Sequence, residues 1–285
     1  MLTKGMKCLF LAARVPFSKI LLTPTQARFL SQKATVTHVI FDFDGLLVDT
    51  ESCYTIANQT MLRKFGREFT QELNAKIMGM KEDEAFPILL KAVGIEDKIT
   101  PKEYVAQYDV ILADMFLKCK AMPGAERLVR HLSKKGVPTA MCSGSRSETF
   151  GPRREPHKEW LDLITLKVFC GSEPQIKRGK PHPEPFLTTM NRLVIFSKVW
   201  LTNIRALHPF AQQVSKFSVK PSDPSKVLVF EDAPNGGRAA KAAGMKCVMV
   251  PNERFRQEAM SVGVTQVLHT LEEFRPEEYG LPRFD

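Results

Sequence analysis

The sequence predicts an α/β fold in which a Rossmann-like parallel sheet forms the core and a small helical domain is inserted into it. Two observations lead to this prediction. Apolar strand-like segments alternate with helical segments through most of residues 37–270. Residues 56–121 are the exception, because their composition is helical throughout and no clear strand interrupts them. We therefore expect a core of residues 37–55 and 122–285, with a helical domain of residues 56–121 between its two parts.

The composition is ordinary for a globular protein. The chain has 285 residues, of which 44% are hydrophobic and 25% are charged, so it can bury the core of one or two domains. No apolar run approaches the roughly 20 residues that a membrane-spanning helix needs, so we expect no membrane partner. The six cysteines are scattered without a CxxC pair, which favours a reducing compartment over a disulfide or zinc framework.

The formal net charge of +10 comes from two segments of the chain. Residues 1–41 contain six basic residues and no acid, and residues 194–220 contain four basic residues and no acid. A protein that binds nucleic acid is expected to carry its basic patch on the folded domain, so we expect no nucleic-acid partner. The basic residues of the two segments are Lys4, Lys7, Arg14, Lys19, Arg28, Lys33, Lys198, Arg205, Lys216 and Lys220.

Residues 1–36 form an N-terminal extension with the composition of a transit peptide, since they are basic, acid-free and contain hydroxyl groups. The stretch Arg28-Phe29-Leu30-Ser31 is similar to the cleavage context of mitochondrial presequences. The alternatives are a disordered extension or a mis-assigned start. We accordingly expect a cytoplasmic or mitochondrial protein.

The first strand, expected over residues 37–41, ends in two acids, Asp42 and Asp44. The carboxyl ends of parallel strands form the rim at which α/β sheets bind ligands, and Gly45 permits a sharp turn there. Two carboxylates this close repel each other unless a cation or a shared proton offsets their charge. Mg²⁺ commonly takes one or two carboxylates together with a substrate phosphate. The alternative is a strand end capped by solvated acids.

Helices are expected over residues 51–65 and 125–135, each ended by a glycine. After the second of them, a strand over residues 137–142 runs into Ser143-Gly144-Ser145. Small hydroxyl and glycine residues between a strand and a helix can cradle a phosphate with their backbone N–H groups. In isolation, such a stretch is more often a plain loop.

Residues 146–166 are interpreted as a polar, irregular stretch before a short strand at residues 168–171. Its basic side chains could contact a phosphate ester, but a solvated loop is the favoured interpretation. Further on, Lys180 lies between Gly179 and Pro181, which suits a fixed position better than a mobile one. The basic residues of the stretch are Arg146, Arg153, Arg154 and Lys158.

Residues 194–215 interrupt the core as an atypical insert. They could form an apolar helix, a partner surface or an oligomer contact, or they could be translated intron sequence. After them, an apolar strand at residues 226–230 runs into Glu231 and Asp232, as the first strand runs into its acids. Two strand ends that carry acids could share one cation. A helix is expected over residues 238–243, and strands over residues 245–250 and 266–269.

The stretch Asp42-Phe-Asp44-Gly45-Leu-Leu-Val-Asp49-Thr50-Glu51 resembles the first motif of the haloacid dehalogenase-like hydrolases. Ser143, Lys180-Pro181 and Glu231-Asp232 follow in the order of the second, third and fourth motifs. The chain departs from the family pattern at Gly144, where a hydroxyl residue is usual, and at His182, where an aspartate is frequent. The pseudouridine 5′-phosphatase-like branch is suggested by Met122-Pro-Gly-Ala-Glu126, Phe230-Glu-Asp-Ala-Pro-Asn-Gly236 and Val248-Met-Val-Pro251.

The resemblance implies Mg²⁺-dependent hydrolysis of a small phosphate monoester, such as the nucleotide pseudouridine 5′-phosphate. Asp42 would attack phosphorus and form an aspartyl phosphate. Asp44 would protonate the leaving alcohol and then activate water, so a closed cap should raise its pKa. Ser143, Gly144 and Lys180 would hold the phosphoryl oxygens, and Lys180 would also neutralise their charge.

The implied ligands of Mg²⁺ are Asp42, the backbone carbonyl of Asp44, and Asp232, with Glu231 close by. Residues 56–121 would be a mobile cap that closes over the site and selects the substrate. We expect the partner to be a small phosphorylated metabolite and the protein to be a monomer. Two alternatives stay open: a sugar-phosphate phosphatase or phosphomutase of the same fold, and a catalytically silent binding protein that uses the insert as its interaction surface.

Overall fold

A computed structural model describes residues 35–193, 221 and 223–285 of the chain. The chain separates into Met1–Lys33 and Ala34–Asp285, and the described residues belong to the second unit. The predictions for the N-terminal extension and for the insert at residues 194–215 therefore concern residues outside the described ones, apart from Thr35 and Val36. No helix within the described ranges is long and apolar enough to cross a membrane.

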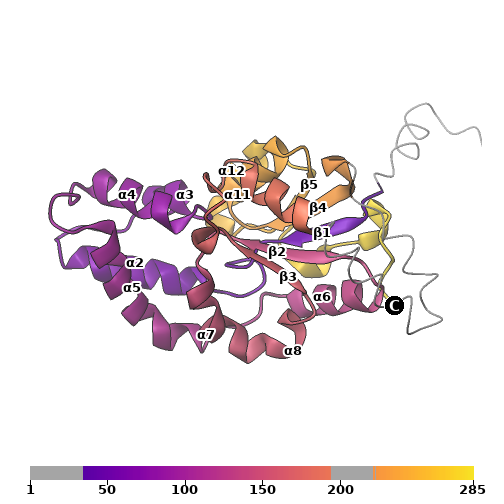
Figure 1. Ribbon diagram of the computed structural model, residues 1–285, viewed down its shortest axis with the longest axis horizontal. Coiled ribbons are helices and arrows are strands. Elements are labelled where there is room, and N and C mark those ends of the chain that lie inside the picture. The colour runs from indigo at the N-terminus through magenta and orange to yellow at the C-terminus, as the bar shows by residue number, and fades with distance from the viewer. Residues whose placement is uncertain (1–34, 194–220, 222) are drawn as a thin grey trace, which may run out of the picture. The chain divides into compact units, whose positions relative to one another are not determined.

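Six parallel strands form one sheet in the order β3-β2-β1-β4-β5-β6 (Figure 1). At the end of β1, Phe41 is in register with Met141 of β2 and Phe230 of β4. This topology confirms the predicted parallel α/β core. The strands are β1 (His38–Phe41), β2 (Thr139–Ser143), β3 (Leu166–Phe169), β4 (Val227–Glu231), β5 (Lys246–Met249) and β6 (Gln266–Val267).

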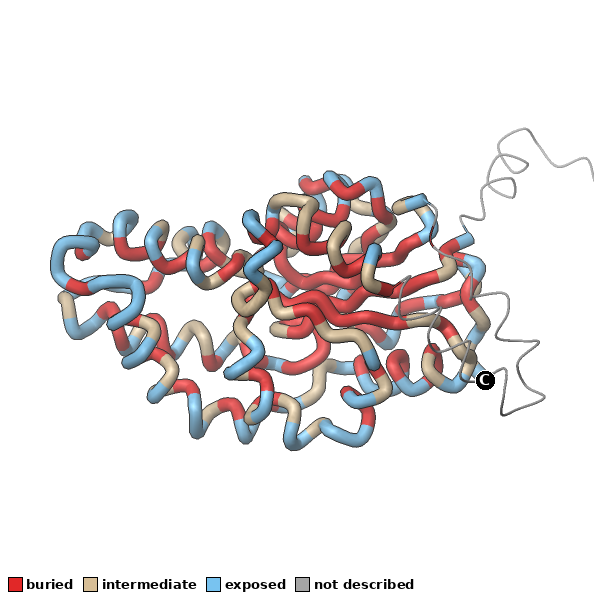
Figure 2. Tube along the Cα trace, in the orientation of Figure 1, coloured by how far each residue is buried: buried red, intermediate tan, exposed pale blue. Residues whose placement is uncertain are grey.

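Helices α6 (Ala125–Lys134) and α8 (Lys158–Leu161) cover one face of the sheet, and α11 (Pro234–Ala242) and α12 (Arg256–Val262) cover the other (Figure 1). Side chains of a strand alternate between the two faces. Val39 and Phe41 accordingly pack with residues of α6, while Ile40 packs with residues of α11. Figure 2 shows the central strands buried between these two layers, which explains why their sequences are mostly apolar.

Four helices lie between β1 and α6: α2 (Glu51–Arg63), α3 (Gln71–Ile77), α4 (Glu82–Val93) and α5 (Pro101–Phe116). A capping box of Thr100 and Glu103 begins α5. Aromatic rings hold the group together, since the ring of Phe86 lies 5.3 Å from those of Tyr104 and Tyr108. These helices correspond to the predicted helical domain, although its boundary at residue 56 falls inside α2. A separate and mobile cap stays a prediction.

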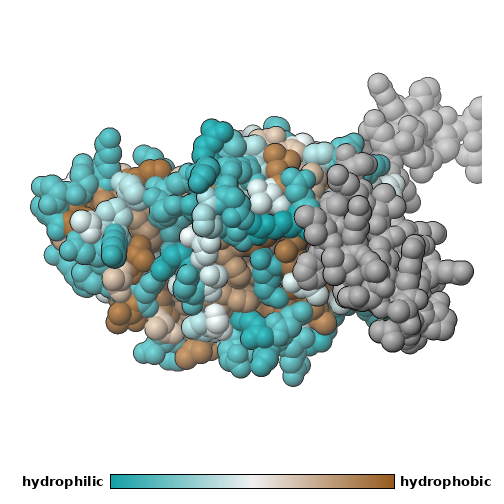
Figure 3. All heavy atoms as spheres, in the orientation of Figure 1, coloured by the Kyte–Doolittle hydropathy of each residue, from teal (hydrophilic) through white to brown (hydrophobic). Residues whose placement is uncertain are grey.

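Hydrophilic residues dominate the face of the molecule seen in Figure 3, and apolar residues occur there in separate small areas. Among the described residues, the large apolar side chains that are well exposed are Ile56, Val110, Leu117 and Met260. Singly exposed apolar side chains of this kind are ordinary on a protein surface.

The prediction that residues 146–166 form an irregular, solvated stretch is wrong. The chain there forms short helices that pack Phe150, Trp160 and Leu161 into the core. Pro156 lies in the first turn of its helix, where the missing N–H costs nothing. The short elements are η1 (Ser147–Thr149), α7 (Phe150–Arg154), η2 (Glu155–His157) and, after β3, η3 (Cys170–Ser172).

The C-terminal segment returns over the core. Leu271, Phe274 and Tyr279 are buried, and the ring of Phe274 lies 4.8 Å from that of Phe230 in β4. This packing fixes the strand whose last residue is Glu231. The remaining short helices are η4 (Pro224–Lys226), η5 (Glu253–Phe255), η6 (Leu271–Glu273) and η7 (Pro276–Tyr279).

Candidate active site

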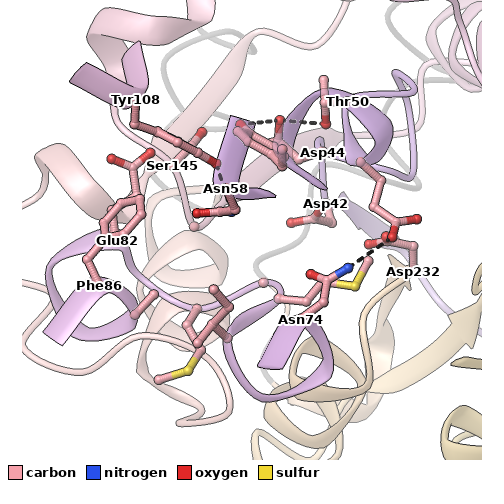
Figure 4. Close-up of a pocket in the computed structure, with 18 residues that line it drawn as sticks. Asp42, Asp44, Thr50, Asn58, Asn74, Glu82, Phe86, Tyr108, Ser145 and Asp232 are labelled. Atoms are coloured by element: carbon pink, nitrogen blue, oxygen red, sulfur yellow. Dashed lines mark hydrogen bonds between the residues drawn. The ribbon is translucent and has the colours of Figure 1, made fainter. Parts of the chain in front are cut away.

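The predicted site residues lie together at the carboxyl ends of three neighbouring strands. Asp42 follows β1, Ser143 is the last residue of β2, and Glu231 and Asp232 stand at the end of β4. Asp42 and Asp232 line a cavity whose other walls come from helices α2–α5 and the loops beside them, and Figure 4 shows the labelled residues that line it. The strand-end argument therefore placed these residues correctly, because parallel strands deliver their last residues to one edge.

Lys180 lies at the centre of the buried charges and is itself only 1% exposed. Its Nζ donates to Asp42 Oδ1 at 2.5 Å, to Glu231 Oε1 at 2.6 Å and to the carbonyl of Cys142 at 3.0 Å. Burial alone would lower the pKa of Lys180, but the charges of Asp42 and Glu231 outweigh burial and hold this pKa well above its ordinary value. The ammonium is therefore a permanent positive charge beside Asp42.

Three carboxylates meet beside this lysine. Oxygens of Asp42, Glu231 and Asp232 lie within 4.8 Å of one another, and all three residues are buried. Burial is the main cause that raises the pKa of Asp42 and of Asp232, and the neighbouring negative charges raise both further. One lysine cannot neutralise three buried carboxylates, so the site is short of positive charge. A hard divalent cation with oxygen ligands, such as Mg²⁺, fits this donor set.

Both carboxylate oxygens of Glu231 accept hydrogen bonds from other groups of the protein. Its Oε1 accepts from Lys180, and its Oε2 accepts the backbone N–H groups of Asp232 and Ala233 at 3.1 and 3.2 Å. Asp42 and Asp232 retain oxygens that could face a cation, whereas Glu231 orients Lys180 and the turn after β4. This distribution favours Asp42 and Asp232 as the direct ligands of a metal ion.

Asp44 is held by a set of donors on the other side of Asp42. Its Oδ1 accepts from Thr50 and Tyr54 at 3.0 Å and from Arg153, and its Oδ2 accepts from Ser143 at 3.0 Å. Burial raises the pKa of Asp44, but the charge and hydrogen bond of Arg153 and the hydroxyl donors outweigh burial, so the pKa lies below its ordinary value. The expected rise in this pKa is therefore wrong for this arrangement of the chain.

Arg153 is the functional-site residue that sequence reasoning missed. It was assigned to a solvated loop, yet its side chain is fully buried beside Asp44. The local sequence contained one indication that Arg153 is buried. Phe150 precedes Arg153 by three residues, so on a helix both side chains lie on the same face, and an apolar residue on that face favours its burial. Its partner Asp44 lies 109 positions away, so local sequence could not identify it.

The structure explains why position 144, in the predicted phosphate cradle, is a glycine and not the usual hydroxyl residue. A Cβ atom at this position would lie 2.6 Å from the carbonyl oxygen of Met80. The loop between α3 and α4 therefore packs directly on Gly144, and the hydroxyl side chain found in the family pattern would not fit. Ser145 supplies a hydroxyl in the next position, with its Oγ 2.7 Å from that of Ser143.

The cavity combines acids, aromatic rings and amides. Its carboxylates are Asp42, Asp44, Glu51, Glu82 and Asp232, and none of the described residues that line it is a lysine, arginine or histidine. Figure 4 shows Glu82, Phe86 and Tyr108 on the side opposite Asp42 and Asp232. The far wall, which a leaving group would meet, is therefore aromatic and negatively charged. The other residues that line the cavity include Thr50, Tyr54, Asn58, Asn74, Ile77, Met80 and Ser145.

Arg146 fastens this wall to the core. Its guanidinium donates to Glu82 of α4 at 2.5 Å and to both oxygens of Asp109 of α5 at 2.8 and 2.7 Å. Asn235 adds a second link through the carbonyls of Lys76 and Met78 at 3.3 and 3.1 Å. Arg146 too was expected in a solvated loop, and this expectation is wrong. These bonds tie helices α3 to α5 to the core beside the site.

Comparisons with known proteins agree with this geometry. Residues 36–244 match the family model described as haloacid dehalogenase-like hydrolase. The Arabidopsis thaliana protein named "(DL)-glycerol-3-phosphatase 1, mitochondrial" is 38% identical over 252 residues, which are 88% of this chain and 76% of that protein. The Drosophila melanogaster protein named "Probable pseudouridine-5′-phosphatase" is 35% identical over 249 residues, 87% of this chain and 96% of that protein.

Solved structures show the same fold. A haloacid dehalogenase family hydrolase from Deinococcus radiodurans, crystallised with phosphate and sodium, aligns with a TM-score of 0.58 and 21% identity, covering 88% of this chain and 100% of that one. The family match spans strands β1 to β4 and all four motifs. The chain therefore belongs to the haloacid dehalogenase-like hydrolases, as its first motif predicted, and is a phosphoric monoester hydrolase of that family.

Proposed function

We propose that this protein is a Mg²⁺-dependent phosphatase that hydrolyses a small monophosphate of an uncharged alcohol through an aspartyl-phosphate intermediate on Asp42. The observation that carries the proposal is the contact of Asp42 with Lys180, at 2.5 Å, inside a group of three buried carboxylates of which Asp42 and Asp232 line the cavity. A carboxylate nucleophile needs no base, because it is ionised at neutral pH when a cation offsets its burial.

Each step can be assigned to a residue of the chain. Asp42 attacks phosphorus as the bond to the leaving oxygen breaks. Asp44 is ionised beside Arg153, so it first takes a proton from the monoanionic ester and then gives that proton to the leaving oxygen. Water then attacks the same phosphorus, Asp44 takes the water's proton, and Asp42 is released. Lys180 offsets the charge of the phosphoryl oxygens, which the backbone N–H groups at Gly144 hold, while the hydroxyl of Ser143 donates to Asp44.

Mg²⁺ would be held by Asp42, Asp232 and the backbone carbonyl of Asp44, and it would neutralise charge on the transferring phosphoryl group. Chelation should therefore stop turnover. The loop after β1 approaches the proposed metal site closely at Gly45. A Cβ atom at this position would lie 2.3 Å from Asp232 Oδ2, and the φ of +79° also favours glycine.

The charge of the cavity favours an uncharged leaving group. The cavity has carboxylates and no described cation to receive a second phosphate or a carboxylate, so bisphosphates and phosphorylated acids would be repelled. The names of two relatives, glycerol-3-phosphatase and pseudouridine-5′-phosphatase, both refer to esters of uncharged alcohols. We propose both esters as candidate substrates, and disfavour a phosphomutase, which must bind a bisphosphate.

A panel of monoesters with Mg²⁺ and with chelator tests this function. It should contain glycerol 3-phosphate, pseudouridine 5′-phosphate and hexose phosphates, with both phosphate release and ester isomerisation measured. Metal-dependent phosphate release would support the proposal. Isomerisation without release would favour the phosphomutase, and a folded protein that turns over nothing would favour the binding protein.

The charge of the cavity leads to a specificity prediction. 3-Phosphoglycerate differs from glycerol 3-phosphate by one carboxylate, and we expect its kcat/KM to be lower by at least about 10-fold, or about 1.4 kcal/mol. Glu82→Gln should reduce this preference. The assay belongs in mildly alkaline buffer, because burial raises the pKa of Glu82.

Asp109→Asn is the matched control, since it weakens the same Arg146 contact but does not line the cavity. Equal changes in both variants would assign the effect to the Arg146 contact. Equal kcat/KM values for the two esters in the unmodified enzyme would refute the charge argument itself.

We also propose that residues 1–36 direct the protein to mitochondria, because they are basic and acid-free and because one relative's name includes "mitochondrial". A fluorescent protein fused behind residues 1–36 should reach mitochondria, and replacement of its arginines and lysines by glutamine should leave it in the cytosol. A cytosolic signal from the unaltered fusion would contradict import.

A further inference from the structure

Arg153 uses every donor it has inside the protein. A guanidinium carries five N–H groups. Nε donates to the carbonyl of Thr149 at 3.0 Å. Nη1 donates to Asp44 Oδ1, and it also donates to Tyr54 Oη at 2.7 Å. Nη2 donates to Ser145 Oγ at 3.1 Å and to Thr149 Oγ1 at 2.6 Å. No donor is left for a phosphate, and Arg153 is absent from the described residues that line the cavity. It is therefore not placed to bind substrate.

Two aromatic rings fix the guanidinium in place. Its carbon lies 5.2 Å from the ring centroid of Phe43 and 5.0 Å from that of Phe116. Removing a guanidinium fully from water costs several kcal/mol unless charge and hydrogen bonds compensate for it. The compensating charge here is the carboxylate of Asp44, so the burial of Arg153 and the position of Asp44 depend on each other.

The two oxygens of Asp44 are in different environments. Oδ1 accepts from Arg153, Tyr54 and Thr50, whereas Oδ2 accepts from Ser143 alone among the residues that the structure describes. An oxygen with three donors has no remaining lone pair for a further proton. Oδ2 retains that capacity, and Asp44 is among the residues that line the cavity beside Thr50 in Figure 4.

We propose that Arg153 is a positioning residue that occupies Oδ1 of Asp44 and so makes Oδ2 the oxygen that exchanges protons with the leaving alcohol and the attacking water. Asp44 is ionised beside Arg153, so Oδ2 first takes the proton of a monoanionic phosphate ester as that ester binds. In the first step Asp42 bonds to phosphorus, the P–O bond to the leaving group breaks, and the proton of Oδ2 moves to the alkoxide oxygen. In the second step the oxygen of water bonds to phosphorus, the bond from phosphorus to Asp42 breaks, and water gives a proton back to Oδ2. The inference rests on the proposed phosphatase function.

Leaving-group dependence tests the role of Arg153. General acid catalysis contributes about 100-fold or more for a poor leaving group such as an alkoxide, and little for 4-nitrophenolate, which leaves unprotonated. Arg153→Met should therefore lower kcat/KM by about 100-fold for glycerol 3-phosphate and by less than about 5-fold for 4-nitrophenyl phosphate. A purely structural role would lower both values alike, and that result would overturn the proposal.

The adjacent Arg154 supplies the matched control. It lies on the same helix but pairs with Asp162, away from the cavity. Arg154→Met should change both kcat/KM values by less than about 2-fold, because loss of an exposed ion pair has a small effect. A loss confined to glycerol 3-phosphate in this control as well would assign the effect to the helix rather than to Arg153.

A double-mutant cycle with Asp44→Asn shows whether Arg153 acts through Asp44. In the Asp44→Asn background, Arg153→Met should cause no further loss on glycerol 3-phosphate, because the group that it positions is gone. Additive losses would contradict the proposal. Should Arg153→Met fail to fold, Tyr54→Phe carries the same test, since it removes a hydroxyl that contacts both Asp44 and Arg153. If the unmodified enzyme hydrolyses no alkyl ester, the proposed function itself fails.

Discussion

Asp42→Asn should lower phosphate release by at least about 1000-fold, because it removes the proposed nucleophile while keeping the shape of the side chain. Each neighbouring carboxylate has another role, since Asp44 is held by Arg153, Glu231 is held by Lys180, and Asp232 is proposed as a ligand of Mg²⁺. The measurement is steady-state phosphate release on the best ester of the panel. It should be accompanied by acid quenching, which traps an aspartyl phosphate on the unmodified enzyme and none on the variant.

Asp49→Asn is the matched control for this experiment. Asp49 belongs to the same motif but is exposed, so its loss should leave turnover within about 2-fold. If Asp42→Asn retained more than a tenth of the turnover in a folded protein, another group would have to attack phosphorus. A trapped phosphoenzyme on the variant would lead to the same conclusion.

Lys180→Met should damage both activity and stability. The variant leaves the carboxylates of Asp42 and Glu231 buried without their cation, and breaking a buried pair in this way costs about 3–5 kcal/mol in the free energy of unfolding. Added Mg²⁺ should restore part of that free energy, because the ion supplies the missing positive charge. Denaturant unfolding with metal and with chelator measures both effects.

Lys177→Met provides the comparison, because Lys177 is exposed three residues earlier. Its free energy of unfolding should match that of the unmodified protein within about 0.5 kcal/mol, with or without Mg²⁺. An unfolding midpoint of Lys180→Met that equals this control in chelator would mean that the buried carboxylates are not charged in the absence of metal. The electrostatic account of the site would then be wrong.

The parts of the site that could be predicted are those encoded by short stretches. Apolar strands that end in Asp42, Ser143 or Glu231 identify both the sheet and its ligand-binding edge, since parallel strands deliver their ends together. Lys180 was recognisable from the residues that fix the backbone on either side of it. These arguments need no knowledge of which segments become neighbours.

Burial of a charged side chain is different, because it depends on partners far along the chain. Arg146 was assigned to solvent, but Glu82 and Asp109 lie 64 and 37 positions away and surround it. Gly144 departs from the family pattern for a similar reason, since the carbonyl that excludes a side chain belongs to Met80. Neither contact leaves a pattern in the residues beside it, so a single sequence could not reveal them.

The tight packing around Gly45 and Gly144 has a consequence for how such an enzyme can change. At both positions even one methyl group would meet protein atoms, at 2.3 Å and 2.6 Å, so the end of the cavity that handles phosphorus tolerates almost no variation. The opposite wall consists of ordinary side chains on helices α2–α5, which can be exchanged without moving the backbone. Evolution or a protein engineer can therefore alter which alcohol is accepted while the bond that is broken stays the same.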